Sequence, residues 1–227
     1  MKKLIYIYLL IVTSSILLAF SSNYFPFKIQ YHCDKTLHKT ASDICYSYSR
    51  KEPDFVVYTL YGNLVNKNNY SRKHISFKPD YELPKQCRSY PNDYTHSGYD
   101  RGHHQENASF DYSRKIQKET FLMSNIAPQA KWLNRKYWPK VERFSRFLAV
   151  KYGKVNVITG NCGSIGHLKN HINIPQWWYK IIYIPKLKKF IAFLAPNTNK
   201  GMKTAKLKKY LVLVEKIEET CKIKIEK

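Results

Sequence analysis

One segment with helical spacing lies among several short runs of β-branched and aromatic residues, and this mixture favours an α+β fold. Over residues 133–151 apolar side chains recur every three or four positions, as they do on one face of a helix. Runs that predict strands lie at residues 55–61, 155–160, 180–185 and 189–194, the last two as a hairpin. Because no internal repeat or linker separates these segments, we expect a single domain over residues 54–227.

The remaining segments carry weaker patterns. Residues 22–53 are polar and predict an irregular arm ahead of the domain. Residues 78–98 contain several prolines and predict a long loop without regular structure. Residues 115–121 leave helix and loop both open. A final pair of elements, at residues 207–214 and 217–225, is expected to close the chain.

The N-terminus has the composition of an export signal. Met1-Lys2-Lys3 is followed by an apolar stretch and then by the small-residue exit Ala19-Phe20-Ser21. We therefore expect residues 1–21 to be a signal peptide. The alternative is an uncleaved membrane anchor over residues 4–20, since the apolar stretch reaches the lower limit of a spanning length. Both interpretations export the rest of the chain, either as a periplasmic or secreted protein without stable membrane association or as an anchored one.

The chain is strongly basic. Lys and Arg number 39 against 16 Asp and Glu, which gives a formal net charge of +23. A field of this strength favours polyanionic partners such as nucleic acid, anionic lipid or acidic polysaccharide. The many Lys, Asn, Ile and Tyr residues also fit AT-rich coding, which accounts for part of the excess. Charge alone therefore indicates a partner without identifying it.

Five cysteines occur, at positions 33, 45, 87, 162 and 221. Cysteines of an exported chain are usually paired, and an odd number leaves at least one over. Cys33 and Cys45 enclose a short loop, and a bond between Cys162 and Cys221 would tie the chain end to the body. Cys87 is then the natural remainder. No Cys-x-x-Cys spacing indicates a zinc or redox site.

The densest chemical motif is Asp100-Arg101-Gly102-His103. Hydrolysis of a phosphodiester needs an activated water and compensation of the charge that develops on the phosphate. A neutral imidazole accepts a proton from water near neutral pH, and a guanidinium two residues away can bind phosphate in a bidentate manner. We expect Gly102 to permit close approach of a nucleic-acid backbone.

Further motifs follow in order: Asn125-Ile126-Ala127-Pro128-Gln129, then Asn134, Trp138 and Glu142. Together with the first motif, this series resembles the DNA/RNA non-specific endonucleases of the ββα-metal superfamily. The resemblance runs from about Tyr58 to Ile225. It implies a ββα-metal finger embedded in a mainly antiparallel sheet flanked by helices. It also implies a phosphodiesterase that cuts DNA and RNA through contacts to backbone phosphates and leaves 5′-phosphate ends.

The resemblance assigns a role to each matching residue. His103 corresponds to the general base and Asn134 to the single direct ligand of a Mg²⁺ ion, with Mn²⁺ as a possible substitute. Glu142 corresponds to the carboxylate that holds metal-bound water. The phosphate-binding arginines are Arg101 and, in a looser alignment, Arg72; Arg135 is a further substrate contact. Asp100, Asn125 and Gln129 are expected to support the site, the last two by hydrogen bonds.

One segment departs from the family pattern. Members usually carry a small-residue and proline run directly after the histidine, whereas this chain has His104-Gln105-Glu106-Asn107. Glu106 adds negative charge near phosphate, which leaves open a catalytically weak or inactive relative that only binds nucleic acid. A disulfide-tied structural or adhesive surface protein is a third hypothesis, but it leaves the motifs unexplained.

Several other residues have plainer interpretations. Asn134 is also a good helix N-cap. His167 and His171 have helical metal-pair spacing but lie in a polar loop, so no ligation is expected. The lysines of residues 186–189 and 203–209 are solvated faces by default, and they become a DNA track only if they share the side of the molecule that carries His103.

Overall fold

The computed structural model describes residues 19–67 and 69–227. Residues 1–18, which carry most of the predicted signal peptide or anchor, lie outside the described residues. Residues 19–21, assigned to the same signal, are described and belong to strand β1 (Ala19–Ser22), where Phe20 is buried against Phe55. The predicted boundary at residue 21 therefore falls inside a strand. None of the helices among the described residues is long and apolar enough to span a membrane.

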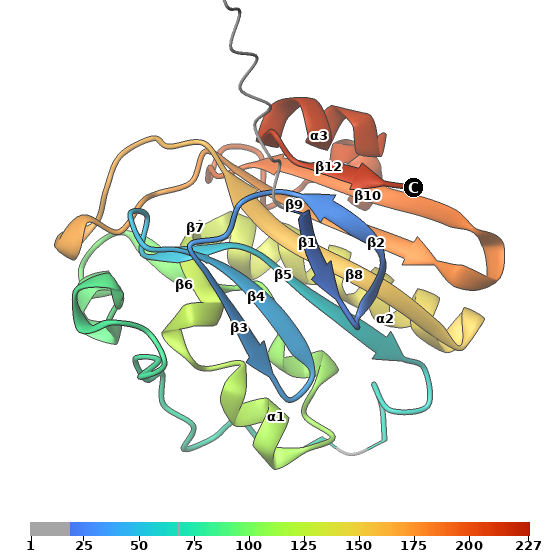
Figure 1. The fold of residues 1–227 in the computed structure, drawn as a ribbon, viewed down its shortest axis with the longest axis horizontal. Coiled ribbons are helices and arrows are strands. Elements are labelled where there is room, and N and C mark those ends of the chain that lie inside the picture. Colours follow the sequence, from blue (N-terminus) through green and yellow to red (C-terminus); the bar gives the residue numbers. More distant parts are fainter. Residues whose placement is uncertain (1–18, 68) are drawn as a thin grey trace, which may run out of the picture.

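A seven-stranded sheet forms the centre of the fold, with every neighbouring pair antiparallel in the order β11-β10-β9-β8-β5-β4-β3 (Figure 1). Its strands are β3 (Lys35–Lys39), β4 (Ser42–Ser47), β5 (Glu52–Tyr61), β8 (Lys154–Cys162), β9 (Trp177–Ile184), β10 (Lys189–Pro196) and β11 (Leu211–Val212). The strands predicted from β-branched and aromatic runs are the four at its centre, and the predicted hairpin is β9–β10. The expectation of an α+β fold with a mainly antiparallel sheet is confirmed.

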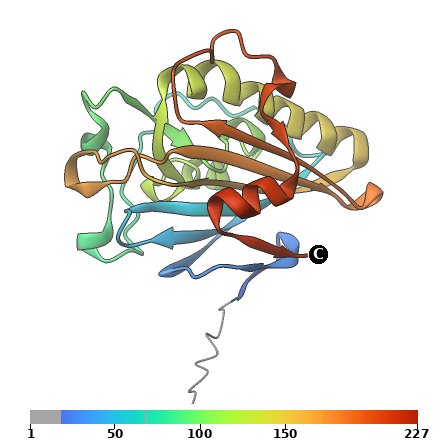
Figure 2. The same cartoon turned by 90° about the horizontal axis from the view of Figure 1, so that it is seen from above.

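Both faces of this sheet are covered, and β5 shows how. Val56, Tyr58 and Leu60 point into one core and Phe55 and Val57 into the other, because successive side chains of a strand alternate between faces. The first core lies under helix α2 (Trp138–Tyr152) and the strand pair β6 (Tyr99–His103) and β7 (Ile126–Ala130). The second lies under helix α3 (Val214–Cys221) and a small sheet of β1, β2 (Phe25–Gln30) and β12 (Lys224–Glu226). Figure 2 shows α2 and α3 on opposite sides of the central sheet.

The helix predicted over residues 133–151 is present, but it begins with a π-helical turn, Leu133–Tyr137, before α2 proper. Asn134 lies inside this turn and is not an N-cap, which is the position of Trp132. A π-turn widens the helix and turns side chains away from the regular spacing, and such turns are frequent at functional sites. The helix ends at Gly153, whose φ of 89° is readily adopted only by glycine.

The expectation of an irregular arm over residues 22–53 is wrong. This segment forms β2, β3 and β4 and begins β5, and all of β4 is buried. Its polar side chains have partners inside the fold: Asp43 accepts a hydrogen bond from Ser22 (2.6 Å), and Ser42 donates to Gln105 (3.0 Å). Polar side chains can be buried when they form hydrogen bonds, and composition alone does not show which of them will find a partner.

The predicted loop, the ambiguous short segment and the expected disulfides are as follows in the structure. Residues 78–98 form a loop broken only by the short 3-10 turns Lys85–Cys87 and Pro91–Tyr94. The ambiguous segment near residue 115 is helix α1 (Arg114–Glu119). The expected disulfides Cys33–Cys45 and Cys162–Cys221 are both present, and Cys87 forms no disulfide within the described part of the chain.

Candidate active site

The predicted ββα unit is present. Strand β6 (Tyr99–His103) pairs antiparallel with β7 (Ile126–Ala130), and the π-turn and α2 follow β7 directly. The register places Asp100 opposite Gln129 and His103 opposite Ile126. His103 thus stands at one end of β6 and Asp100 lies near the other, beside the chain that leads into the helix carrying Asn134.

These elements enclose a cavity of about 580 Å³. Its lining residues are Arg72, Phe77, Asp100, Arg101, His103, Glu106, Asn107, Ala108, Asn134, Arg135, Pro139 and Glu142. Every residue that the sequence predicted for catalysis, metal binding or substrate binding is in this set. Asn125 and Gln129, predicted only as supports, lie behind it.

His103 is held between two aromatic rings. The ring centroids of Phe77 and Phe121 lie 5.4 Å and 5.2 Å from that of its imidazole. Its Nε2 atom is buried and has no hydrogen-bond partner among the described residues. Burial, and then the nearby charge of Arg72, lowers the pKa of His103 to about 3. The imidazole is therefore neutral at physiological pH, which is the form able to accept a proton.

Asn134 is oriented by the first residue of the motif. Its side-chain Nδ2 donates to Asp100 Oδ2 over 3.0 Å, which leaves the amide oxygen available. The guanidinium group of Arg135 donates two hydrogen bonds to the same carboxylate, from Nε to Oδ2 (2.7 Å) and from Nη2 to Oδ1 (2.6 Å). Burial opposes the ionisation of Asp100, but the hydrogen bonds from Arg135 and Asn134 outweigh it and lower the pKa of Asp100.

The two arginines near the expected phosphate position are braced by aromatic rings. Arg101 lies over Phe77, with its Cζ 5.3 Å from the ring centroid, and donates from Nη2 to the Pro91 carbonyl (2.6 Å). Arg72 lies over Phe121 at 5.3 Å. The rings that hold His103 thus also hold both guanidinium groups, which line the cavity and form no ion pair with a carboxylate in the described part of the chain.

Glu106 lines the cavity, but its negative charge is paired inside the fold. It is buried, and Oε2 accepts hydrogen bonds from Tyr58 (2.6 Å) and from the fully buried Lys180 (3.1 Å). Ser109 donates to the other oxygen (2.8 Å). Burial raises the pKa of Glu142 to about 7, and the neighbouring charge of Glu106 adds to this. The sequence did not single out Lys180 as a site residue, although a lysine within the apolar run of β9 indicates a buried acidic partner.

The two supporting residues differ from each other. Asn125 exchanges hydrogen bonds with the backbone of Gln105, in the segment after His103 (2.9 and 3.0 Å). The side-chain amide of Gln129 is buried and makes no hydrogen bond among the described residues, so its predicted hydrogen-bonding role is not found. Gln129 instead packs beneath Gly102.

That packing corrects the expectation for Gly102. A Cβ atom at this position would lie 2.6 Å from Gln129 Cβ and 3.0 Å from Trp178 Cη2. The glycine is therefore required by the inward face of β6, where the strand approaches Gln129 and Trp178, and not by an approaching nucleic-acid backbone. His104 also points inward: it is fully buried, lies 4.6 Å from the Trp178 ring, and its Nε2 is 3.0 Å from Asn161 Nδ2.

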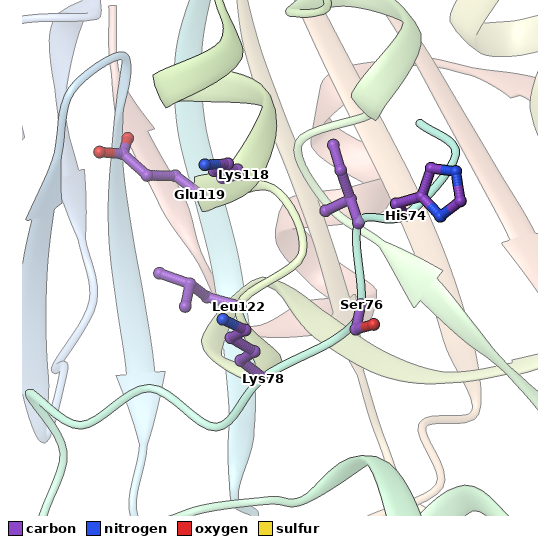
Figure 3. Close-up of a pocket in the computed structure, with 7 residues that line it drawn as sticks. His74, Ser76, Lys78, Lys118, Glu119 and Leu122 are labelled. Carbon is purple, nitrogen blue, oxygen red and sulfur yellow. The ribbon is translucent and has the colours of Figure 1, made fainter. Parts of the chain in front are cut away.

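A second cavity, of about 250 Å³, lies beyond the segment that carries Phe77 (Figure 3). Ser76 and Lys78 line it, together with His74, Ile75, Lys118, Glu119 and Leu122, whereas Phe77 between them faces His103. It contains no residue predicted for catalysis, and the candidate site is therefore the larger of these two cavities.

The donor atoms of the larger cavity fit a hard divalent cation. The available amide oxygen of Asn134 and the carboxylate of Glu142 are oxygen ligands, which Mg²⁺ and Mn²⁺ prefer. No cluster of three or more His, Cys, Asp or Glu side chains with metal-binding geometry occurs within residues 19–67 and 69–227. Such sparse protein ligation suits a cation that retains most of its water.

Comparisons with known proteins agree with this arrangement. The family model for DNA/RNA non-specific endonucleases matches residues 22–226. The mitochondrial nuclease of Saccharomyces cerevisiae is 36% identical over 117 residues, covering 51% of this chain and 36% of that protein. Nuclease C1 of Cunninghamella echinulata var. echinulata is 33% identical over 158 residues, covering 63% of each. Human mitochondrial endonuclease G is 30% identical over 165 residues, covering 65% of this chain and 54% of that protein.

Each of these alignments spans less than two thirds of the relative's own length. Among solved structures, a chain of the EndoG/EndoGI complex superposes with a TM-score of 0.78 at 25% identity, covering 85% of this chain and 86% of the other. The fold, the ordered motifs and the family match lead to one conclusion: the chain belongs to the DNA/RNA non-specific endonuclease family.

Proposed function

We propose that the protein is an exported, metal-dependent endonuclease, periplasmic or secreted, that hydrolyses phosphodiester bonds of DNA and RNA and leaves 5′-phosphate ends. The observation that supports this most directly is the convergence of His103, Asn134, Glu142 and two arginines on one cavity. The arginines of the cavity suit phosphate, which every nucleotide carries, and this fits an enzyme that is indifferent to sequence and sugar.

In this proposal His103 is the general base. Its neutral imidazole takes a proton from a water molecule that attacks the phosphorus. The buried Nε2 atom supports this role, because it has hydrogen-bonding capacity that the described part of the fold does not use. Phe77 and Phe121 keep the ring in place between them.

Asn134 and Glu142 would hold a Mg²⁺ ion, with Mn²⁺ as a substitute, Asn134 directly and Glu142 through water. A bound divalent ion supplies polarisation of the phosphate and stabilisation of the departing 3′ oxygen. Arg101 and Arg72 offset the negative charge that develops on the phosphate oxygens. Arg135 holds Asp100 and lies beside the substrate path.

The hypothesis of an inactive relative depended on the segment after His103. Glu106 is paired with Lys180, so it does not repel substrate phosphate as an unpaired carboxylate would, although its charge still contributes to the raised pKa of Glu142.

The test is digestion of plasmid DNA and of single-stranded RNA with and without chelator. We expect cleavage of both in Mg²⁺, none in chelator, and a loss of about 10²–10⁴-fold in His103→Ala. His74→Ala is the matched control, since His74 is exposed and lies outside the reaction cavity. Equal cutting by His103→Ala and His74→Ala would overturn the mechanism.

A further inference from the structure

The loop that follows β10 is unusually basic. We define the lysine loop as residues 197–210, which carry Lys200, Lys203, Lys206, Lys208 and Lys209. All five are exposed. Their sequence alone leaves open whether they share a side of the molecule with His103.

Two asparagines tie the start of the loop to the ββα unit. Asn197 Oδ1 accepts a hydrogen bond from the backbone N–H of Ala130 (2.7 Å), and Asn199 Oδ1 accepts one from that of Trp132 (2.8 Å). Asn197 Nδ2 also donates to the carbonyl of Pro128 (3.0 Å). The loop therefore begins directly alongside the segment that joins β7 to the π-turn of Asn134.

The far part of the loop is tied to the helix. Lys140 Nζ donates to the Ala205 carbonyl (2.7 Å) and the Tyr137 hydroxyl to the Leu207 carbonyl (2.9 Å). Met202 and Ala205 are buried in the same core as α2. The loop is thus held along residues 130–140, on the side of the central sheet that carries α2 (Figure 2).

Nothing nearby in the chain neutralises these lysines. No Asp or Glu occurs between Glu142 and Glu215. Among the described residues, no ion pair uses a lysine of the loop. Lys203 is positioned instead by the ring of Trp132, with its Nζ 4.2 Å from the ring centroid, and Lys131 lies 4.9 Å from the same ring.

This cluster stands at the start of the segment that leads into the reaction cavity. Trp132 is followed closely by Asn134 and Arg135, both of which line the cavity.

We propose that the lysine loop is a phosphate-binding track that holds the nucleic-acid strand flanking the bond to be cut. This inference rests on the proposed nuclease function and adds to it a surface that contacts the polynucleotide beyond the reaction cavity. Ammonium groups on exposed lysines bind phosphates without reading bases, so the track increases affinity and not sequence preference.

The experiment measures binding in a His103→Ala background, so that cleavage does not interfere. The test variant carries Lys200→Gln, Lys203→Gln and Lys206→Gln. The matched control carries Lys28→Gln, Lys222→Gln and Lys224→Gln, which remove the same charge. These three lysines are exposed and lie on or next to β2 and β12, on the face of the central sheet opposite α2. Fluorescence anisotropy with a 30-base-pair DNA duplex is recorded from about 50 to 200 mM salt, the range over which phosphate binding changes affinity strongly.

We expect the slope of log binding constant against log salt to fall by about 0.9 for each phosphate that the variant no longer neutralises, and therefore by up to about 2.7 in the test variant. The control should keep the parental slope. Equal slopes in the two triple variants would overturn the track, because the effect would then follow net charge and not position.

A second readout uses proteins with His103 intact. For the test variant we expect a raised KM on long DNA and unchanged hydrolysis of bis(p-nitrophenyl) phosphate, which is too small to reach the loop. Loss of both activities would overturn the track by placing the damage in the reaction cavity. If the parent protein hydrolysed neither substrate, the proposed function would fail, and the binding slopes would still decide whether the lysine loop holds nucleic acid.

Discussion

The side-chain amide of Asn134 donates a 3.0 Å hydrogen bond to the carboxylate of Asp100, so the first residue of the Asp-Arg-Gly-His motif orients the residue proposed to hold the metal. The same carboxylate is gripped by Arg135, which fixes its position. Groups that orient a metal ligand in this way commonly influence metal affinity as strongly as neighbouring ligands do.

We predict that Asp100→Asn weakens the apparent affinity for Mg²⁺ by about 10- to 100-fold, because the new amide no longer offers two acceptor oxygens to Asn134 and Arg135. The measurement is cleavage rate against Mg²⁺ concentration. Glu226→Gln, which removes an exposed carboxylate on β12, should leave the titration unchanged. An unaltered Mg²⁺ dependence in Asp100→Asn would show that Asn134 is oriented by something else.

Gly102→Ala is predicted to destabilise the protein by about 1–3 kcal/mol, since the added methyl group overpacks a buried contact. Its Cβ would lie 2.6 Å from Gln129 Cβ and 2.7 Å from Gln129 Oε1. Trimming Gln129 to Ala removes the oxygen but keeps the nearer carbon, so the double variant should recover only part of the stability. Urea unfolding midpoints test this; full stability in Gly102→Ala would contradict the close approach.

Lys180→Met is predicted to lower the free energy of unfolding by about 3–5 kcal/mol, because it leaves the buried carboxylate of Glu106 without its cation. Adding Glu106→Gln should restore most of that stability, since an amide carries no charge to compensate. The two single variants and the double variant form a double-mutant cycle in urea. Additive effects would mean that the two charges do not depend on each other.

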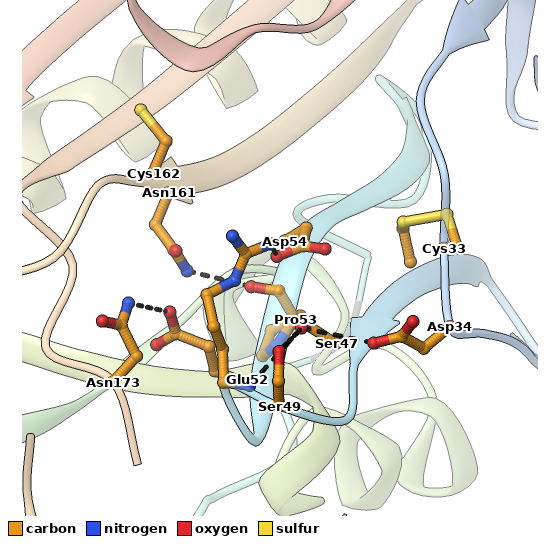
Figure 4. A network of polar contacts seen from close by, with 12 residues as sticks. Cys33, Asp34, Ser47, Ser49, Glu52, Pro53, Asp54, Asn161, Cys162 and Asn173 are labelled. Atoms are coloured by element: carbon orange, nitrogen blue, oxygen red, sulfur yellow. Dashed lines mark hydrogen bonds and ion pairs between the residues drawn. A yellow bond between two sulfur atoms is a disulfide. The ribbon is translucent and has the colours of Figure 1, made fainter. Parts of the chain in front are cut away.

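Glu52 gives the fold a dependence on pH. Its carboxyl group is buried, accepts a hydrogen bond from Asn173 (2.7 Å) and lies in a polar cluster with Asp54 and Asn161 (Figure 4). Burial raises the pKa of Glu52 to about 8, and the Asn173 hydrogen bond and Arg50 oppose this only in part. The folded state therefore keeps a proton that the unfolded state, with a pKa of 4.5, releases.

Because the folded state binds the extra proton, the stability contributed by Glu52 is complete below pH 4.5 and is lost as pH rises toward 8. Within that window the slope approaches about 1.4 kcal/mol per pH unit. Glu52→Gln keeps an acceptor for Asn173 and cannot titrate. The free energy of unfolding of the wild type, relative to that of the variant, should therefore fall as pH rises across the window. Parallel stability curves from pH 4.5 to 8 would refute a protonated Glu52.

Local patterns determined much of what the structure contains. Helical spacing over residues 133–151 and β-branched runs at β5, β8, β9 and β10 predicted these elements correctly, because periodicity records which face of each element is buried. The motifs, taken in chain order, identified the residues that line the cavity, because each motif requires a specific side chain at a specific position in the chain.

Tertiary structure decided the rest, because it depends on partners distant in sequence. Burial of the polar residues 22–53, neutralisation of Glu106 by Lys180, and the packing of Gly102 on Gln129 each join segments that no local pattern connects. The position of the lysine loop is the clearest case: its charge is visible in the sequence, but only the hydrogen bonds of Asn197 and Asn199 to residues 130 and 132 bring that charge beside Asn134.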